Sequence, residues 1–203
     1  NQVSSYNSKL GVLCDFICPL IENFIWVSVA ESVPSPKRCQ QCPQGQWSTP
    51  DHKNCSGCSI GKYVIDVAMQ KCANCSTGMY SDNAGSIACK ICLPGKFQNE
   101  SGKSFCIECE RGMYAPNNAS SICFECQPGR ETLSTGETNC TSCKLGHYKT
   151  LSRERLCSKC PFGKFANQTD TIMCHNCPLG RKTANYEGAI SKEVCVICPK
   201  GTY

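Results

Sequence analysis

Residues 72–92 read CANCSTGMYSDNAGSIACKIC, and the unit in this stretch recurs along most of the 203-residue chain. Cys-x-x-Cys pairs begin at positions 39, 55, 72, 89, 106, 123, 140, 157, 174 and 195, with one interval of 16, seven of 17 and a last one of 21. So regular a period indicates one small structural unit copied end to end in a quasi-one-dimensional array.

Each copy has the pattern C-x-x-C-x-x-G-x-aromatic. Glycine is third after the second cysteine of every pair, at Gly45, Gly61, Gly78, Gly95, Gly112, Gly129, Gly146, Gly163, Gly180 and Gly201. Two residues later stands an aromatic side chain, at Trp47, Tyr63, Tyr80, Phe97, Tyr114, Tyr148, Phe165 and Tyr203, with Glu131 and Lys182 as exceptions. We expect each glycine to have a positive φ or a close neighbour that excludes a Cβ atom. We expect each aromatic ring to be the main apolar plug of its copy.

Cysteine takes the place of an ordinary hydrophobic core in this composition. The hydrophobic fraction is 40%, but 22 residues are cysteine, so about 29% remains for other apolar residues. A short copy cannot offset about 1–2 kcal/mol of backbone entropy per residue by burial alone. A disulfide that closes a loop of about 14 residues contributes about 3 kcal/mol. The sequence therefore predicts a small, disulfide-rich, mostly β or irregular fold with almost no helix.

Disulfides persist in oxidising compartments, which predicts an extracellular or cell-surface protein of the secretory pathway. Six sequences fit the N-glycosylation pattern and agree with this location. Their asparagines are Asn54, Asn74, Asn99, Asn118, Asn139 and Asn167.

Zinc is the main alternative, because paired Cys-x-x-Cys motifs about a dozen residues apart also form structural zinc sites. The nearly constant interval argues against it, since zinc modules are usually joined by irregular linkers. The three histidines, His52, His147 and His175, lie at unrelated phases of the repeat. Thioredoxin-like redox chemistry uses one such pair on a βαβ scaffold and not ten in a row. We expect no metal and no cofactor.

Two disulfide schemes fit the spacing. In the forward scheme, which we favour, the second cysteine of each pair bonds to the first cysteine of the next. The bonds are then Cys18 to Cys39, Cys42 to Cys55, Cys58 to Cys72, Cys75 to Cys89, Cys92 to Cys106, Cys109 to Cys123, Cys126 to Cys140, Cys143 to Cys157, Cys160 to Cys174 and Cys177 to Cys195. The other scheme joins whole pairs in twos, for example Cys39 to Cys55 with Cys42 to Cys58, and would require a 34-residue alternation that the sequence lacks.

Each loop resembles a small hairpin. Turn-forming residues follow the aromatic position, as in Asp82-Asn83-Ala84-Gly85, and an apolar residue precedes the next cysteine. Ile87, Phe105, Ile122, Leu156, Met173 and Val194 occupy that return position. We expect two short extended segments per copy, and ten copies at about 4.8 Å per strand would form a rod on the order of 100 Å long.

Residues 1–38 differ from the rest and are expected to form a degenerate or capping repeat, while 39–203 hold the ten repeats, the last one truncated. Cys14 and Cys198 would need partners outside this sequence. The longest uncharged apolar run, 24–30, is far short of the about 20 residues of a membrane span. Ile25 and Trp26 within it are candidates for an interface.

Charge and polar residues identify no catalytic or nucleic-acid site. The net charge of +5 is spread over the copies without a concentrated basic stripe. Histidines and carboxylates are scattered, and no phosphate-binding glycine loop joins a strand to a helix. We therefore expect no enzyme and no nucleic-acid partner.

The run Cys39-Gln40-Gln41-Cys42-Pro43-Gln44-Gly45-Gln46-Trp47-Ser48, echoed in 89–97, 157–165 and 195–203, resembles the ephrin-receptor-like, or GCC-type, cysteine-rich repeat. It is also similar to the single-disulfide submodule of tumour necrosis factor receptors, although the six-cysteine grouping of a full receptor domain is absent. The resemblance covers about residues 39–203 and implies elongated extracellular modules. It transfers no ligand-contacting residue to this chain.

Two functions fit these observations. The first is a glycosylated spacer or subunit of a cell-surface coat, ciliary hair or extracellular filament, which associates with itself or with other matrix or surface proteins. The alternative is a receptor or adhesion ectodomain that binds a protein or glycan. Its candidate residues lie in the atypical copies, at Glu131, Arg181, Lys182 and Tyr186.

Overall fold

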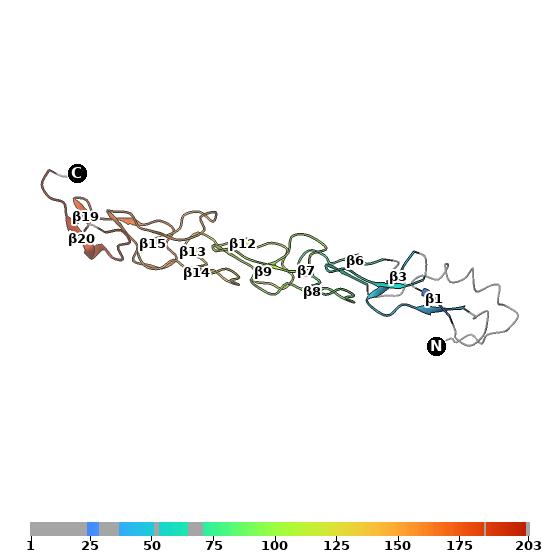
Figure 1. Cartoon of the computed structure of the whole chain (residues 1–203). Coiled ribbons are helices and arrows are strands. Elements are labelled where there is room, and N and C mark those ends of the chain that lie inside the picture. Colours follow the sequence, from blue (N-terminus) through green and yellow to red (C-terminus); the bar gives the residue numbers. More distant parts are fainter. Residues whose placement is uncertain (1–23, 29–36, 51–52, 65–70, 185, 202–203) are drawn as a thin grey trace. The chain divides into compact units, whose positions relative to one another are not determined.

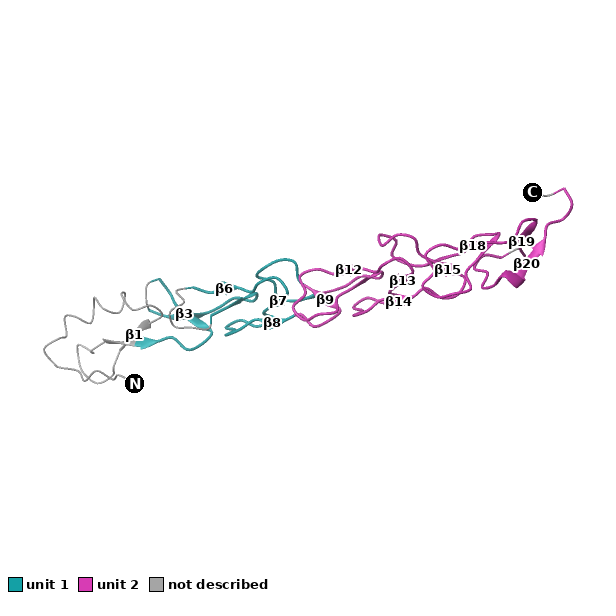
Figure 2. Cartoon of the chain, turned by 180° about the vertical axis from the view of Figure 1, so that it is seen from behind, with its two compact units in different colours: residues 1–91, 98–106 teal, residues 92–97, 107–203 magenta. Residues whose placement is uncertain are grey.

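A computed structural model describes residues 24–28, 37–50, 53–64, 71–184 and 186–201, with the backbone alone at 24–28 and 37–39 (Figure 1). The expectations for Cys14, Cys18 and Tyr203, and for the side chains of Ile25, Trp26 and Cys39, lie outside what it describes. The chain divides into two compact units, one of residues 1–91 with 98–106 and one of residues 92–97 with 107–203 (Figure 2).

The described residues form short antiparallel hairpins, as the sequence predicted, and contain no α-helix. Their strands are β1 Phe24–Ser28, β2 Lys37–Gln41, β3 Gln46–Ser48, β4 Cys55–Gly57, β5 Lys62–Tyr63, β6 Ala73–Asn74, β7 Met79–Tyr80, β8 Lys90–Ile91, β9 Lys96–Phe97, β10 Ile107–Glu108, β11 Met113–Tyr114, β12 Phe124–Glu125, β13 Arg130–Glu131, β14 Thr141–Ser142, β15 His147–Tyr148, β16 Ser158–Lys159, β17 Lys164–Phe165, β18 His175–Asn176, β19 Arg181–Thr183 and β20 Cys195–Ile197. A 3-10 helix, η2, covers Lys192–Val194.

Each strand pairs with its neighbour in sequence. The first unit contains the sheets β1–β2, β3–β4, β5–β6 and β7–β8, and the second contains β9–β10 through β19–β20. In β7–β8, Met79 lies opposite Ile91 and Tyr80 opposite Lys90. The first arm of a typical hairpin thus follows the glycine, and the second arm consists of the residues between the two cysteines of the next pair.

This register corrects the position expected for the returning arm. The apolar residues that precede each first cysteine lie before the second strand and not in it. Five of them are exposed: Ile87, Phe105, Ile122, Leu156 and Met173. Val194 is the exception, because it packs on the cluster of Phe165, Ala189 and Cys195.

The repeated glycines have the backbone that the sequence predicted. Their φ values lie between 75° and 85° at Gly45, Gly61, Gly78, Gly95, Gly112, Gly129, Gly146, Gly163, Gly180 and Gly201. An L-residue enters this left-handed region at a cost of about 1–2 kcal/mol. The turn between the two arms has a second positive-φ residue in many loops: Gly85, Gly102, Ala119, Gly136, Asp170 and Gly188.

The expectation for the aromatic plug was wrong. Among the described rings at this position only Phe165, 8% exposed, is buried, whereas Trp47, Tyr63, Tyr80, Phe97, Tyr114 and Tyr148 are half-buried. The buried layer instead consists of the second cysteines and the residue that follows the aromatic position. Because successive side chains of an extended segment point to opposite sides, the ring and its successor cannot both face the same neighbour.

Candidate functional site

Disulfides join the loops in the forward order. The structure has Cys42–Cys55, Cys58–Cys72, Cys75–Cys89, Cys109–Cys123, Cys126–Cys140, Cys143–Cys157, Cys160–Cys174 and Cys177–Cys195, with Cα–Cα distances of 5.6–5.8 Å. Cys92 and Cys106 are also disulfide-bonded, and Cys198 is free. Sulfur atoms joined in this way cannot act as the thiolate ligands that a structural zinc site requires.

One position of the repeat, directly after the aromatic position, is buried in each of the nine loops in which the structure describes it. Its residues are Ser48, Val64, Ser81, Gln98, Ala115, Thr132, Lys149, Ala166 and Thr183, all 0–9% exposed. They differ widely in size and polarity, so burial at this position does not come from hydrophobicity. In six of these loops a backbone bond holds the position inside, because the carbonyl of this residue accepts the amide hydrogen of the preceding loop's glycine. These bonds measure 2.7–3.2 Å from Gly61, Gly78, Gly95, Gly112, Gly129 and Gly146.

A second contact reaches two loops along the chain. A Cβ atom built on Gly95 would lie 1.9 Å from the carbonyl oxygen of Gly136, and one on Gly146 would lie 2.1 Å from that of Gly188. Gly45, Gly61, Gly112 and Gly129 meet the backbone of a later turn in the same way. At these six positions, therefore, glycine is needed both for its φ and for this approach.

The turn that makes this approach also donates a hydrogen bond. Gly136 N–H binds the carbonyl of Cys109 at 2.8 Å, and four other turns do the same for an earlier second cysteine: Gly85, Gly102, Ala119 and Gly188. In the loop closed by Cys143–Cys157, Arg153 stands at the turn position and lacks a positive φ. The equivalent carbonyl there, on Cys126, accepts a bond from the Lys149 ammonium group at 2.9 Å instead.

The ammonium group of Lys149 is thus buried, and its hydrogen-bond partners are backbone carbonyls. Its side chain is 0% exposed, and its Nζ atom also donates to the carbonyl of Arg130 at 2.9 Å. Burial lowers the pKa of Lys149, while Glu125, Glu131 and Glu154 act in the opposite direction. Charge-assisted hydrogen bonds to two carbonyls offset part of the desolvation of the ammonium group. Lys149 therefore supplies in this loop the donor that a turn amide supplies elsewhere.

Glu131, which replaces an aromatic ring, is also turned inward. It is 6% exposed, and its Oε2 atom accepts the backbone amide hydrogen of Cys157 at 2.8 Å. A carboxylate that accepts a backbone amide is a strong hydrogen-bond partner. The structure therefore does not place Glu131 on the surface with the other candidate recognition residues, but ties it to a cysteine of the following loop.

The remaining candidate recognition residues are exposed. They lie in the loop closed by Cys177–Cys195, whose cysteines are 18 residues apart and not 13 or 14. Arg181 Nη1 donates to the carbonyl of Cys195 at 3.0 Å, so part of its guanidinium group is used within the hairpin. Lys182 is exposed, and Tyr186 is 44% exposed.

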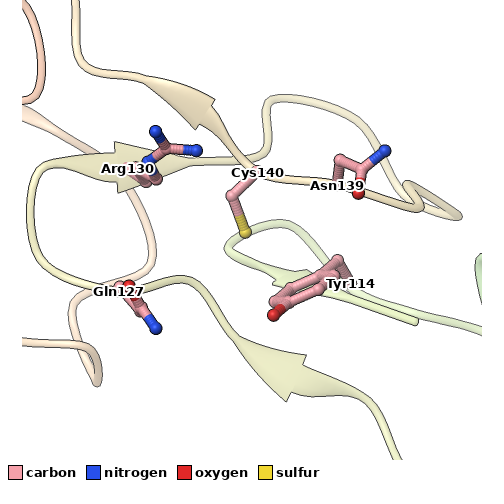
Figure 3. Close-up of a pocket in the computed structure, with 5 residues that line it drawn as sticks. All are labelled: Tyr114, Gln127, Arg130, Asn139 and Cys140. Atoms are coloured by element: carbon pink, nitrogen blue, oxygen red, sulfur yellow. The ribbon is translucent and has the colours of Figure 1, made fainter. Parts of the chain in front are cut away.

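A surface recess of about 380 Å³ lies in the second unit. It is lined by Tyr114, Gln127, Arg130, Asn139 and Cys140 (Figure 3). The Tyr114 ring is held by its cross-strand neighbour Phe124, with ring centroids 5.9 Å apart. Sequence reasoning missed this recess because its residues come from strands β11 and β13 and from the loops that contain Gln127 and Asn139, which are distant in sequence.

All six predicted glycosylation asparagines are exposed: Asn54, Asn74, Asn99, Asn118, Asn139 and Asn167. Exposure makes these side chains accessible, and their glycosylation stays a prediction. Asn74 lies close to Gly102, on which a Cβ atom would be 3.2 Å from the Asn74 Cγ atom. Asn139 borders the recess.

Surface charges form ordinary ion pairs. Lys90 lies 2.8 Å from Asp82, and its hydrogen bond lowers the pKa of the Asp82 carboxyl. Lys96 and then Thr135 lower the pKa of Glu108 in the same manner. Because these pairs are exposed to solvent, water and salt screen them and they contribute little to stability. In the described part of the chain no three His, Cys, Asp or Glu residues gather to hold a metal ion, and no described helix is long and apolar enough to cross a membrane.

One comparison with known proteins finds a match. A family model described as tyrosine-protein kinase ephrin type A/B receptor-like matches residues 61–104, 78–121, 131–172 and 150–195. These overlapping matches together cover more than half of the chain. No curated protein matches the chain significantly. The repeats match a class of disulfide-rich extracellular module, and together with the disulfides they point to an extracellular or secreted protein.

Proposed function

Because the chain belongs to the tyrosine-protein kinase ephrin type A/B receptor-like family of cysteine-rich repeats, we propose that it is a non-enzymatic structural protein of the extracellular space. In this role it is a glycosylated, disulfide-stapled spacer, or a subunit of a surface coat, ciliary hair or extracellular filament. Its partners are further copies of the chain or other matrix and surface proteins.

The observation that carries this proposal is that two residues that depart from the repeat consensus, Glu131 and Lys149, point into the protein and not toward solvent. In a binding module, departures from the repeat consensus are expected on the surface, where they create a site. Here Glu131 and Lys149 are buried and bond to the backbone of neighbouring loops. These two departures therefore preserve the contacts between loops, which suits a building element whose stability is a sum of nearest-neighbour terms.

The proposal is tested by electron microscopy of native full-length protein isolated without reductant. Ordered filaments or sheets with an axial repeat are expected. Isolated particles at micromolar concentration would contradict the role of coat, hair or filament subunit and leave only that of a spacer.

A receptor or adhesion ectodomain is the second candidate, favoured by the exposure of Lys182 and Tyr186 in the long last loop. Under this function, alanine at Tyr186 lowers capture of a ligand at least about tenfold, as expected for an aromatic anchor. Lys164→Ala, in the neighbouring hairpin, is the control. Equal capture by both variants would remove this loop from consideration.

A further inference from the structure

We propose that the recess beside Tyr114 is the seat of the first sugar of an N-linked glycan carried by Asn139. The ligand class is an N-acetylhexosamine, attached to the same chain that holds it. This inference rests on the proposed function, since it requires a secreted, glycosylated protein.

The acceptor asparagine is at the rim of the recess. Asn139, with Cys140 and Thr141, forms one of the six sequons. Its side chain is exposed and makes only a long hydrogen bond of 3.4 Å among the contacts described, from Nδ2 to Thr138. Figure 3 shows Asn139 and Tyr114 along one side of the recess, with Arg130 and Gln127 along the other. A sugar on Nδ2 therefore begins at the edge of a preformed hollow.

Size and lining suit one sugar ring. The volume of about 380 Å³ is at the low end of the range of about 300–1,000 Å³ for small-ligand sites. Sugars present an apolar face of C–H groups, which packs on an aromatic ring, and a polar edge of hydroxyl and amide groups. Tyr114 supplies the ring, while Arg130 and Gln127 supply hydrogen-bonding groups for the edge.

The neighbouring groups hold this lining in place. Phe124 packs against the Tyr114 ring across the β11–β12 pair. Arg130 Nε lies 3.1 Å from the Asp170 carboxylate, an ion pair that uses one of its five N–H donors. The recess therefore needs little reorganisation to accept a ligand, which reduces the entropy lost on binding.

The test is the rate at which peptide-N-glycosidase releases each glycan from native, disulfide-intact protein secreted by eukaryotic cells. Glycopeptide mass spectrometry resolves the sites. A seated sugar must leave the recess before cleavage, so release at Asn139 is expected to be about fivefold slower than at Asn99 and Asn167, the factor typical of one aromatic contact. In reduced, denatured protein the three rates should be equal.

Variants separate stacking from simple crowding. Tyr114→Leu keeps an apolar side chain without the ring and is expected to abolish the delay, whereas Tyr114→Trp is expected to keep it. Tyr148→Leu, at the same position of another repeat, should leave release at Asn139 unchanged.

Two results would overturn the inference. One is an unoccupied Asn139 in protein that is glycosylated at Asn99 or Asn167, a result that leaves the proposed structural function intact. The other is an occupied Asn139 whose release is as fast as at the other sites, or equally slow in Tyr114→Leu.

Discussion

Replacing Gly95 by alanine tests whether a loop truly contacts the second loop along the chain. The new Cβ atom would lie 1.9 Å from the Gly136 carbonyl oxygen, in a backbone with φ of 83°. Restoring ordinary van der Waals contact of about 3.4 Å requires a backbone shift of about 1.5 Å, which breaks the 2.8 Å bond from Gly136 N–H to the Cys109 carbonyl. We expect a loss of about 2 kcal/mol for this disruption, in addition to about 1 kcal/mol of left-handed strain.

Gly163→Ala is the matched control, because Gly163 has a φ of 77° but no atom within 4 Å of its Cβ position. Hydrogen exchange followed by NMR on the oxidised proteins separates the two effects. The Cys109 amide, which bonds to the Gly95 carbonyl, should exchange about 150-fold faster in Gly95→Ala, since each 1.4 kcal/mol is a factor of ten. The Cys177 amide, its counterpart beside Gly163, should exchange only about fivefold faster in Gly163→Ala. Equal acceleration in both variants, or an unchanged Gly136 amide in Gly95→Ala, would refute the contact between these loops.

Two further predictions concern the buried polar residues. Lys149→Met should lower stability by about 1–3 kcal/mol at neutral pH, because two buried carbonyls lose their donor. The pKa of Lys149 is lowered in the folded state, so as the pH rises the folded protein releases this proton before the unfolded chain does. The difference in free energy of unfolding between wild type and Lys149→Met should therefore grow from neutral pH to about pH 10. Thermal denaturation in a Cys198→Ser background, which removes the free thiol of the described residues, measures this difference. A constant or shrinking difference would contradict the prediction. Glu131→Ala should accelerate hydrogen exchange of the Cys157 amide about tenfold, because the amide loses its acceptor. Glu131→Gln keeps an oxygen acceptor and should change this exchange rate less than about threefold. Equal effects of the two substitutions would show that the 2.8 Å bond from the Cys157 amide to Glu131 does not stabilise the hairpin.

The 17-residue period and the spacing of the cysteines were sufficient to predict the array of hairpins. A unit repeated ten times leaves few ways to pair neighbouring segments, and a glycine at a constant place in each copy marks a backbone requirement that holds in all of them. The positive φ at Gly95 and its approach to Gly136 are examples.

The buried layer could not be predicted, because the repeat position after the aromatic is filled by residues of very different size and polarity. Lys149, Gln98 and Ala115 are all buried at the same place in the repeat, so a search for apolar residues selects the aromatic ring beside them instead. The carbonyl of each of the three accepts the amide hydrogen of the preceding loop's glycine, and this backbone bond holds the position inside. Turn glycines are also absent from the loops that contain Ala119 and Asp170, so the lack of one between Gly146 and Cys157 does not by itself mark Lys149.

The candidate recognition residues were chosen because they break the pattern, and this signal does not distinguish surface from interior. Glu131 is buried while Lys182, at the same repeat position, is exposed. Glu131 has a backbone amide within reach, that of Cys157, which only the packing of the loops reveals.

The most direct test of the account is a disulfide map of the native, unreduced protein. The protease that cleaves after glutamate cuts at Glu108 and Glu125, between the cysteines of two successive pairs, and also at Glu110. Forward pairing predicts a separate product in which the dipeptide 109–110 is joined to the peptide 111–125 by the Cys109–Cys123 disulfide. A digest in which the dipeptide 109–110 is linked to the peptide of Cys126, and the peptide 111–125 to that of Cys106, would establish pairing in twos and contradict the stapled array.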